Sequence, residues 1–378
     1  MVSEQSVIIV GAGPAGLATS ACLNLLSVPN LILEKEDCFA SLWKHRAYDR
    51  LHLHLAKEFC ELPHMPYPPT APTFIPRKDF VRYLDEYVSR FDLKPLCSRS
   101  VESATFSQAD KAWIVQARNT KTDVMEEYQG SFLVVATGEN GEGFIPSIPG
   151  LECFTGEVMH SSQYRTGGKY SNKSALVVGC GNSGMEIALD LCNHGAKVSI
   201  VVRSPFHVFT RNMIHKAMVL LKQLPCDIVD IITVELGELH YGDLTRYGIQ
   251  RPSEGPFRLK DKTGRSPVID VGTIEKIVLG KIKVVPSLKG IREKKVSFSD
   301  GQTRNFDVIV FATGYRSTAK RWLKDDDGLM NAKGMPKERF PRHWKGRNGL
   351  YCAGFSGKGL SGISMDAENI ANDIRKVI

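Results

Sequence analysis

The chain has 378 residues, of which 42% are hydrophobic and 24% are charged, with a net charge of +8 at pH 7. This composition is typical of a globular protein, and the length is enough for two domains with sizeable cores. No dense run of Lys and Arg is interleaved with aromatic residues, so the sequence argues against nucleic-acid binding, while the modest positive charge suits anionic cofactors and substrates.

The amino-terminal residues lead directly into an apolar strand, without a basic segment followed by a long apolar run. We therefore expect no secretory signal. The apolar run over residues 7–21 is interrupted by Gly11, Gly13, Pro14 and Gly16, which favours a strand, turn and helix and argues against a membrane span. The nine cysteines form no C-x-x-C pair. This pattern suits a cytoplasmic protein and predicts neither disulfides nor a metal site.

The first strand, residues 7–10, ends in a turn of the G-x-G-x-x-G type, and a helix is expected over about residues 14–27. In this motif the first glycine makes the tight turn, the second lets the backbone approach a pyrophosphate, and the third lets the helix pack on the strand. The helix N-terminus presents unpaired N–H groups to the anion. The motif comprises Gly11, Ala12, Gly13, Pro14, Ala15 and Gly16.

The next strand, residues 30–34, ends at Glu34, and 34 − 16 places this carboxylate 18 positions after the last glycine of the motif. A carboxylate there accepts hydrogen bonds from ribose hydroxyls and repels a 2′-phosphate, which favours FAD or NAD. Further along, residues 52–76 are rich in proline and predict an ordered loop over a pocket. Apolar residues at helical spacing then predict a helix over 77–91.

A second copy of the turn lies about half a protein later. The strand at residues 175–178 precedes it, and the following strand ends at Arg203 with no acidic residue. Arginine matches a phosphate dianion in geometry, so this site predicts NADP. A strand end that is merely exposed is the alternative for both Glu34 and Arg203. The second motif comprises Gly179, Cys180, Gly181, Asn182, Ser183 and Gly184.

Two buried strands end in the same three small residues, one over residues 132–138 and the other over 307–314. Small residues at the carboxyl end of a strand let the backbone pass close to a cofactor, and a tight corner is the alternative. The recurrence of this ending favours a cofactor role for four residues: Thr137, Gly138, Thr313 and Gly314.

These elements predict an α/β protein with two dinucleotide-binding, Rossmann-like domains, in which the NADP domain is inserted into the FAD domain. The expected FAD domain covers residues 1–153 and returns at 304–378, and the expected NADP domain covers 154–303. The return segment should end in a strand, a glycine-rich loop and a helix whose N-terminus approaches the flavin.

Residues 154–164 resemble the F-x-G-x-x-x-H-x-x-x-[W/Y] signature of class B flavin monooxygenases. Other segments are similar to the plant YUCCA branch of that family, and the resemblance covers essentially the whole chain. These segments are residues 41–44, 48–55, 135–140, 311–315 and 354–356, with Asp366-Ala367 downstream.

The resemblance implies an NADPH- and O₂-dependent monooxygenase of auxin biosynthesis that converts a 2-oxo acid, indole-3-pyruvate, to indole-3-acetate. The implied oxidant is a C4a-peroxide of the flavin acting as a nucleophile. This agrees with the absence of a credible Ser-His-Asp or Cys-His set in the sequence, because the cofactor then carries the difficult step.

The resemblance also implies site residues. Residues 51–58 fit the family's L-x-x-N-x-x-K-E segment with His54 in the place of the active-site asparagine, and His160 is the signature histidine. Trp43 belongs to a matching segment and is expected to contact the flavin. Each histidine has a structural alternative: His54 as a loop cap and His160 as a hinge residue bonded to backbone. Gly357 departs from the family, which usually has arginine there.

Several points stay open in the sequence. Arg77 and Arg211 are both candidates for binding a substrate carboxylate. The apolar residues that follow Arg211, over 213–221, form a helical stripe that is more typical of a core than of an indole pocket. Two other functions remain: a two-nucleotide reductase, against which the missing cysteine pair argues, and a catalytically silent nucleotide-binding protein. The oligomeric state cannot be predicted.

Overall fold

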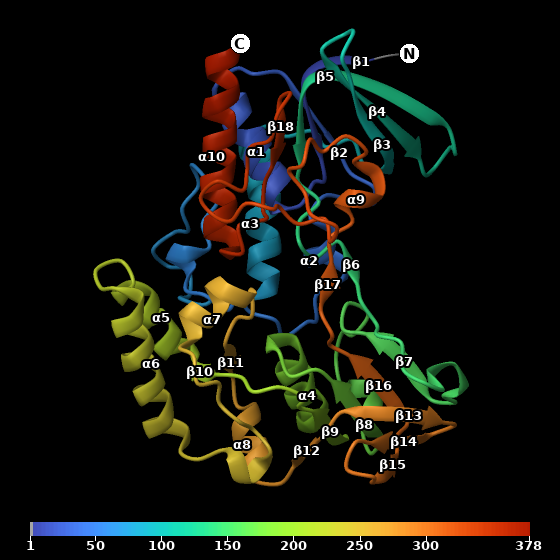
Figure 1. Cartoon of the computed structure of the whole chain (residues 1–378), viewed down its shortest axis with the longest axis vertical. Helices are drawn as coiled ribbons and strands as arrows, with labels where there is room; N and C mark the ends of the chain where they lie inside the picture. Colours follow the sequence, from blue (N-terminus) through green and yellow to red (C-terminus); the bar gives the residue numbers. More distant parts are fainter. Residues whose placement is uncertain (1–2) are drawn as a thin grey trace. The chain divides into compact units, whose positions relative to one another are not determined.

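In a computed structural model, which describes residues 3–378, the chain forms two compact units. The first unit contains the residues up to Arg46 together with 56–142 and 315–378, and the second contains 47–55 and 143–314. In Figure 1 the blue and red ends of the chain lie in the first unit and its middle lies in the second. The insertion of one unit into the other, predicted from the two glycine-rich turns, is confirmed.

The boundaries between the units differ from the expected ones. They fall at 142/143 and 314/315 rather than at 153/154 and 303/304. The second boundary moves because strand β16 (Val308–Phe311) pairs with two strands of the second unit, β8 (Ser174–Val178) and β7 (Glu157–His160). Residues 47–55 also join the second unit, where Tyr48 is part of the hydrophobic core. Pairing and core contacts between residues distant in sequence therefore decide the boundaries.

The first unit is built on a six-stranded sheet with the order β2-β1-β5-β4-β3. Strand β1 pairs in parallel with β2 on one side and with β5 on the other. The far edge of β5 pairs first with β4, antiparallel, and then with β18, parallel. The strands are β1 (Ser3–Val10), β2 (Asn30–Leu33), β3 (Arg99–Ser107), β4 (Ala112–Asn119), β5 (Met125–Val135) and β18 (Leu350–Cys352).

The helices of this unit begin with α1, which starts at Pro14 as predicted and ends at Leu25, two residues early. The predicted helix over 77–91 is confirmed as α3. Figure 1 shows α1 and α10 side by side, and the two helices are in contact. The helices are α1 (Pro14–Leu25), α2 (Ser41–His45), α3 (Arg77–Arg90), α9 (Ala319–Trp322), α10 (Gly359–Val377) and the 3-10 helix η1 (Lys57–Phe59).

The proline-rich loop is held in place by one lysine. The Lys57 ammonium group donates to the carbonyls of Pro68, Pro69 and Ala71 at 2.8–3.2 Å. These bonds close the loop, which the sequence predicted to be ordered, and the lysine supplies donors in a segment where each proline lacks a backbone N–H. Lys57, which belongs to the family-like segment 51–58, therefore has a structural role in holding this loop.

The second unit is built on a fully parallel sheet with the order β12-β9-β8-β16-β7. A three-stranded antiparallel sheet and a short parallel pair, β10 with β11, complete its strands. The strands are β7 (Glu157–His160), β8 (Ser174–Val178), β9 (Lys197–Val201), β10 (Val208–Thr210), β11 (Val268–Asp270), β12 (Ile282–Val285), β13 (Leu288–Arg292), β14 (Lys295–Phe298), β15 (Thr303–Asn305) and β16. Two further strands where the chain passes between the units, β6 (Glu142–Gly143) and β17 (Tyr315–Arg316), pair with each other.

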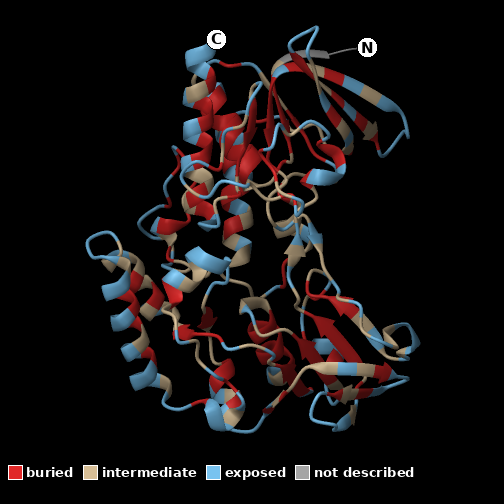
Figure 2. Cartoon of the chain, viewed as in Figure 1, coloured by how far each residue is buried: buried red, intermediate tan, exposed pale blue. Residues whose placement is uncertain are grey.

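Both faces of the parallel sheet in the second unit are covered. Along β8, Ala175 and Val177 belong to one hydrophobic cluster, and Leu176 and Val178 belong to another. This alternation is expected for a strand buried on both sides, and Figure 2 shows these strands in red. The helices are α4 (Asn182–Asn193), α5 (Arg211–Leu220), α6 (Cys226–Tyr241), α7 (Pro256–Thr263), α8 (Thr273–Val278) and the 3-10 helices η2 (Leu151–Cys153), η3 (Gly168–Tyr170) and η4 (Thr245–Tyr247).

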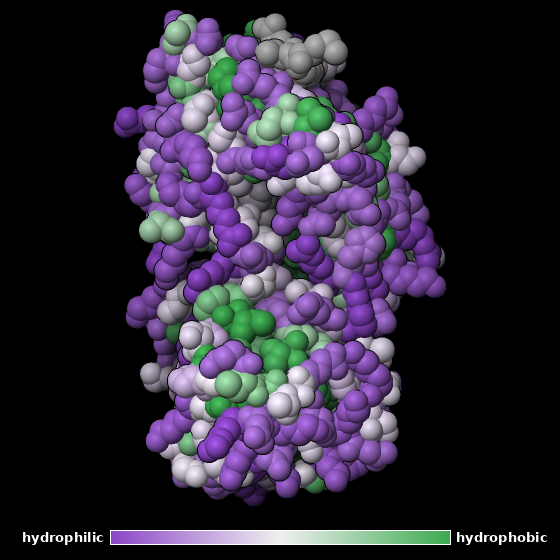
Figure 3. All heavy atoms as spheres, turned by 90° about the vertical axis from the view of Figure 1, so that its right-hand side faces the viewer, coloured by the Kyte–Doolittle hydropathy of each residue, from purple (hydrophilic) through white to green (hydrophobic). Residues whose placement is uncertain are grey.

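The second unit also exposes hydrophobic side chains. On α6, Ile231 is 63% exposed and Leu239 is 86% exposed. Figure 3, which turns the right-hand side of Figure 1 towards the viewer, shows further hydrophobic surface on this unit. Within residues 3–378, no helix is both long enough and apolar enough to cross a bilayer.

Candidate nucleotide-binding and active site

The first glycine-rich turn has the geometry that its sequence predicted. Gly11 has a φ of +108°, and a Cβ there would lie 2.7 Å from the carbonyl oxygen of Ala136. A Cβ on Gly16 would lie 1.9 Å from the carbonyl oxygen of Gly11, so α1 can approach the turn only without a side chain at this position. A Cβ on Gly13 would meet nothing within 4 Å. The turn and packing roles are confirmed, and open space remains where the pyrophosphate is expected.

The second turn repeats these contacts almost atom for atom. Gly179 has a φ of +111°, with a Cβ position 2.4 Å from the carbonyl oxygen of Ala312. A Cβ on Gly184 would lie 2.0 Å from the carbonyl oxygen of Gly179, and one on Gly181 would again meet nothing within 4 Å. Ala136 and Ala312 begin the two Ala-Thr-Gly endings, so each ending lies against one of the glycine-rich turns.

A cavity of about 450 Å³ opens beside the first turn, and all its lining residues belong to the first unit. Ala12 and Gly16 do not line it, because Ala12 is fully buried and Gly16 packs against the turn. Most residues predicted to bind FAD do line it: Gly11, Gly13, Pro14, Ala15, Glu34, Trp43, Thr137 and Gly138.

Glu34 is a buried strand end, only 7% exposed, and not the exposed one considered as an alternative. Its Oε2 accepts a hydrogen bond from the backbone N–H of Ala12 at 2.7 Å, and its Oε1 accepts one from Glu36 at 3.0 Å. Burial raises the pKa of Glu34, while these two backbone bonds act in the opposite direction. The carboxylate is thereby held against the turn and faces the cavity, where its remaining lone pairs can accept ribose hydroxyls.

Two features of the cavity fit an FAD molecule. The side-chain oxygen of Thr137 is buried and has no hydrogen-bond partner among the residues that the structure describes. Buried hydroxyls are normally paired, so this one fits a bound group that supplies the partner. The N-terminus of α10 and the loop before it also line the cavity, as expected for the return segment. Their lining residues are Gly354, Ser356, Gly357, Gly359 and Leu360.

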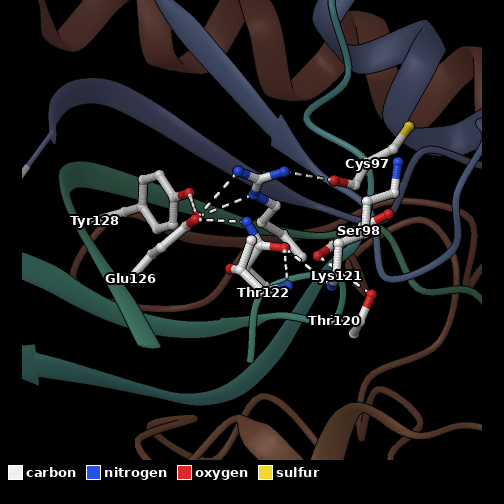
Figure 4. A network of polar contacts seen from close by, with 9 residues as sticks. Cys97, Ser98, Thr120, Lys121, Thr122, Glu126 and Tyr128 are labelled. Carbon is white, nitrogen blue, oxygen red and sulfur yellow. Dashed lines mark hydrogen bonds and ion pairs between the residues drawn. The ribbon is translucent and has the colours of Figure 1, made fainter. Parts of the chain in front are cut away.

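The β3 side of this cavity is held by a polar network. Arg99, which lines the cavity, binds both carboxylate oxygens of Glu126 at 2.9 and 3.1 Å. Asn119 and Tyr128 also donate to Glu126, and Figure 4 shows Glu126 and Tyr128 turned towards each other. The Arg99 guanidinium lowers the pKa of Glu126 to about 2. Sequence analysis missed this network because its members are spread over three strands.

At the second turn, two arginines approach the predicted NADP site. Arg203 follows β9 and is exposed, so the alternative of a merely exposed strand end stays open, and its contact with a 2′-phosphate stays a prediction. Burial raises the pKa of the Cys180 thiol, and the charges of Arg265 and Arg203 oppose that rise. Arg265 is held to this region by a 3.0 Å bond to the carbonyl of Pro205. Sequence analysis missed Arg265, which follows Arg203 by 62 positions (265 − 203).

His160 has both ring nitrogens in hydrogen bonds. Nε2 lies 3.0 Å from the carbonyl oxygen of Gly314 and therefore donates, while Nδ1 accepts from the backbone N–H of Ser162 at 3.2 Å. Burial lowers its pKa, which favours the neutral ring that this pattern requires. A Cβ on Gly143 would lie 2.4 Å from Nδ1. These contacts agree with the interpretation of His160 as a histidine bonded to backbone, and a catalytic role stays only a prediction.

His54 belongs to the second unit, not to the FAD cavity. Its Nε2 lies 2.9 Å from Oε1 of Glu186, a residue of α4 that is 1% exposed. Helix α4 is the helix that begins at the second glycine-rich turn. His54 is therefore anchored to the element that carries the predicted NADP site, and it is not a simple loop cap.

The two candidate arginines have different surroundings. Arg77 donates to the carbonyls of Trp43 and Lys44 at 2.8 and 2.5 Å, which holds the end of α2. Arg211 begins α5, and the carboxylate of Glu186 opposes the lowering of its pKa by burial. The apolar stripe after Arg211 packs into two small hydrophobic clusters through Ile214, Ala217 and Met218. The core interpretation of that stripe therefore holds.

All nine cysteines are free. Among residues 3–378, one group of three metal-ligating side chains lies close together, with the ligand atoms of Asp37, Cys38 and His45 within 4.8 Å of one another. Asp37 and His45 are exposed. We assign no metal to this group.

Two dinucleotide-type turns, each at the end of a parallel strand pair, define a two-nucleotide flavoprotein oxidoreductase. One turn lies beside a cavity that suits FAD and the other beside a pair of arginines. This class includes both monooxygenases and reductases, and the fold alone does not separate them.

Comparison with known proteins separates them. The family described as flavin-binding monooxygenase-like matches residues 4–355. The chain is 54% identical over 376 residues to "Probable indole-3-pyruvate monooxygenase YUCCA10" of Arabidopsis thaliana, covering 99% of this chain and 98% of that protein. It is 47% identical over 372 residues to "Indole-3-pyruvate monooxygenase YUCCA1" of Oryza sativa subsp. japonica, covering 97% and 90%. The chain belongs to the flavin-binding monooxygenase-like family.

Among solved structures, OTEMO in complex with FAD and NADP superposes with a TM-score of 0.77 at 15% identity, covering 100% of this chain and 85% of that one. At this identity the likeness concerns the fold alone. Together with the family membership, it confirms the expected fold class. The protein is a flavin-dependent monooxygenase.

Proposed function

We propose that the protein is an indole-3-pyruvate monooxygenase that forms indole-3-acetate, the auxin, by oxidative decarboxylation. The observation that supports this most is the 54% identity, over nearly the full length of both chains, to a relative whose name carries that activity. One 2-oxo acid, one O₂, one NADPH and one proton would give the shortened acid, CO₂, water and NADP⁺. NADPH and the breaking C–C bond each supply two electrons, and O₂ accepts all four.

The residues of the first unit would hold the flavin, which supplies the hydride acceptor and the group that reacts with oxygen. Gly13 leaves space for the pyrophosphate beside the N-terminus of α1. Glu34 would accept the ribose hydroxyls, and the Thr137 hydroxyl would bond the cofactor. Trp43 and the loop before α10 would cover the cavity and limit the access of water.

The residues of the second unit would hold NADPH. Gly181 leaves the corresponding space at the second turn, and Arg203 with Arg265 would bind the 2′-phosphate. A phosphate dianion between two guanidinium groups favours NADPH over NADH, because NADH has no group to pair with these charges. His54 would donate or accept one hydrogen bond close to the reacting groups, and no side-chain nucleophile is needed.

The test follows three quantities with the purified holoenzyme: NADPH oxidised, O₂ consumed, and ¹⁴CO₂ released from carboxyl-labelled indole-3-pyruvate. We expect a ratio of 1:1:1. NADPH oxidation that is independent of the 2-oxo acid and releases no CO₂ would favour a reductase. A yellow protein that neither oxidises NADPH nor releases CO₂ would favour a catalytically silent one. Pyruvate and phenylpyruvate, run in parallel, test which 2-oxo acid is preferred.

A further inference from the structure

A partly buried cluster of polar side chains surrounds His54 within the second unit. Glu186 of α4 contacts His54 directly, and Tyr48, Arg50 and Arg211 are close enough to influence one another's charge. Burial raises the pKa of Tyr48, and the charge of Glu186 adds to that rise. Residues 48–55 belong to a segment that resembles the family, whereas Glu186 belongs to no predicted site.

The contact between Glu186 and His54 fixes where one proton lies. An ionised carboxylate can only accept, so a 2.9 Å bond to its Oε1 requires a hydrogen on Nε2 of His54. Nδ1 is then the nitrogen that His54 can offer to another group. The His54 side chain is 26% exposed, whereas that of Glu186 is 1% exposed, so the accessible part of the pair belongs to the histidine.

The carboxylate of Glu186 has fewer hydrogen-bond partners than a buried carboxylate with a purely structural role. Its Oε2 is buried without a hydrogen-bond partner among residues 3–378. Asp190, one turn further along α4, is buried to a similar degree, but its Oδ2 accepts from the Tyr164 hydroxyl at 2.7 Å and from the Gly167 N–H at 2.8 Å. A buried carboxylate with one unpaired oxygen costs stability, and such a cost is typical of functional positions.

The guanidinium of Arg211 offsets the negative charge of Glu186, while Glu186 keeps its hydrogen bond to His54. Glu186 and Arg211 interact electrostatically, and burial is the main cause that lowers the pKa of Arg211. A buried ion needs such compensation to remain charged. Arg211 thereby supplies a positive charge near the carboxylate that contacts His54.

We propose that Glu186 is a positioning residue for His54. Its carboxylate holds the imidazole as the neutral Nε2–H tautomer and directs the Nδ1 lone pair outwards, as an acceptor for an N–H or O–H group of a bound molecule. Because Glu186 lies on the helix that starts at the second glycine-rich turn, this acceptor is fixed relative to the predicted NADP site. The positioning role of Glu186 does not depend on the proposed function. Only the turnover measurement described below rests on it.

The tautomer can be measured without turnover. In the FAD-loaded protein labelled with ¹⁵N-histidine, the two ring nitrogens give well-separated NMR signals according to protonation, and His54→Gln identifies those of His54. We expect a protonated Nε2 and a bare Nδ1 at pH 7.5. Glu186→Gln should give a mixture of tautomers, because an amide can either donate or accept. Asp190→Asn is the matched control and should leave the His54 signals unchanged.

Three NMR outcomes would overturn the proposal. The first is a protonated Nδ1 in the unmodified protein, in either the neutral or the doubly protonated ring. The second is a single unchanged tautomer in Glu186→Gln. The third is an Nδ1 signal that does not move when NADP⁺, used as the probe, is added to saturation. Tyr48→Phe separates the carboxylate from its neighbour, and we expect that variant to keep the Nε2–H tautomer.

Turnover gives an independent readout. Loss of a carboxylate that orients a functional histidine typically costs roughly 10–100-fold. We therefore expect Glu186→Gln to lower kcat by about tenfold or more with little change in the KM for NADPH. A KM effect alone would contradict the positioning role. Should the protein prove inactive on every 2-oxo acid, the proposed function fails while the NMR result still decides the role of Glu186.

Discussion

The two units build the same turn with opposite side-chain charge around it. The first glycine has a φ of +108° in one and +111° in the other, and the third glycine lies equally close to the first in both. The next strand ends in a buried carboxylate in the first unit and in an exposed guanidinium in the second. The backbone geometry therefore suits a pyrophosphate in both units, and we expect the charge at the following strand end to favour one nucleotide over the other.

The two Ala-Thr-Gly endings also differ between the units, in the hydrogen bonding of their threonine hydroxyls. The Thr137 hydroxyl is buried without a partner among the residues that the structure describes, whereas the Thr313 hydroxyl donates to the carbonyl of Phe144. The first threonine remains available to a ligand in the cavity, and the second is used within the protein. We therefore expect the repeated motif to have a binding role in the first copy, while in the second it has a structural one.

The largest expected effect is a loss of stability at the third glycine of each turn, where the two units have the same geometry. Gly16→Ala and Gly184→Ala would each place a methyl group about 2 Å from a backbone oxygen, so the helix must move away from the strand. Overpacking of this kind costs typically 1–3 kcal/mol or more, and backbone neighbours place it at the upper end. Thermal unfolding monitored by circular dichroism should show similar losses for both variants. A large loss for only one of them would contradict the equivalence of the turns.

The second prediction separates the two nucleotides. Gly13→Ala and Gly181→Ala put a methyl group into open space at an ordinary φ, so neither should lower the stability of the apoprotein. With cofactors, Gly13→Ala should lose FAD on gel filtration because the methyl group meets the pyrophosphate. Gly181→Ala should stay yellow but be reduced more slowly by NADPH. If both variants lose FAD alike, the order of the two sites is misassigned.

The third prediction concerns the strand ends. Arg203→Ala removes a charge-assisted bond to the 2′-phosphate, worth about 1.5–3 kcal/mol, so the preference for NADPH over NADH should shrink roughly tenfold or more. Arg265→Ala should act in the same direction, and the double variant should lose most of the preference. The ratio of kcat/KM for the two nucleotides measures this. Equal values in the unmodified protein would reject the assignment.

The fourth prediction uses the two threonines. Thr137→Val removes a hydroxyl that has no protein partner, so the apoprotein should be at least as stable while FAD binds more weakly. Thr313→Val removes a bond that the protein uses and should destabilise the second unit by about 1 kcal/mol. Chemical denaturation of the apoproteins, with titration of FAD into each, compares them. Identical behaviour of the two variants would refute the division of roles.

The smallest expected effect is the loss of stability at low pH. His160 has a lowered pKa, so its contribution to stability is complete above its unfolded pKa near 6.5 and is lost as the pH falls below that value. Glu126 has a pKa of about 2, so its contribution is complete above 4.5 and is lost between about 4.5 and 2. Because the Glu126 side chain is about a quarter exposed, its contribution should be only about 1 kcal/mol.

Hydrogen exchange followed by mass spectrometry should therefore show weakened protection of the second unit at pH 5.5, before the first unit responds. His160→Gln should remove the step below pH 6.5, and Glu126→Gln should remove the one at lower pH. Simultaneous loss of protection in both units would contradict the separate assignments.

Much of this site could be predicted because its signals are local in sequence. The glycine spacing, the strand ends at Glu34 and Arg203 and the helix over 77–91 each depend on residues close together along the chain. Arg265 and Glu186 could not be found in this way, because neither residue type is unusual in its own segment. Their importance comes from neighbours that the fold brings together, such as His54, which is 132 positions from Glu186.

The sequence by itself determined the two nucleotide-binding turns, the insertion of one unit into the other and the family. These depend on backbone conformations that only particular residues can adopt, so the residue types are visible as a pattern. The tertiary structure alone decided where the units divide, that residues 47–55 join the second unit, and that both nitrogens of His160 are occupied. It also decided which oxygen of which carboxylate faces His54, because burial and hydrogen bonding are properties of surroundings assembled from distant parts of the chain.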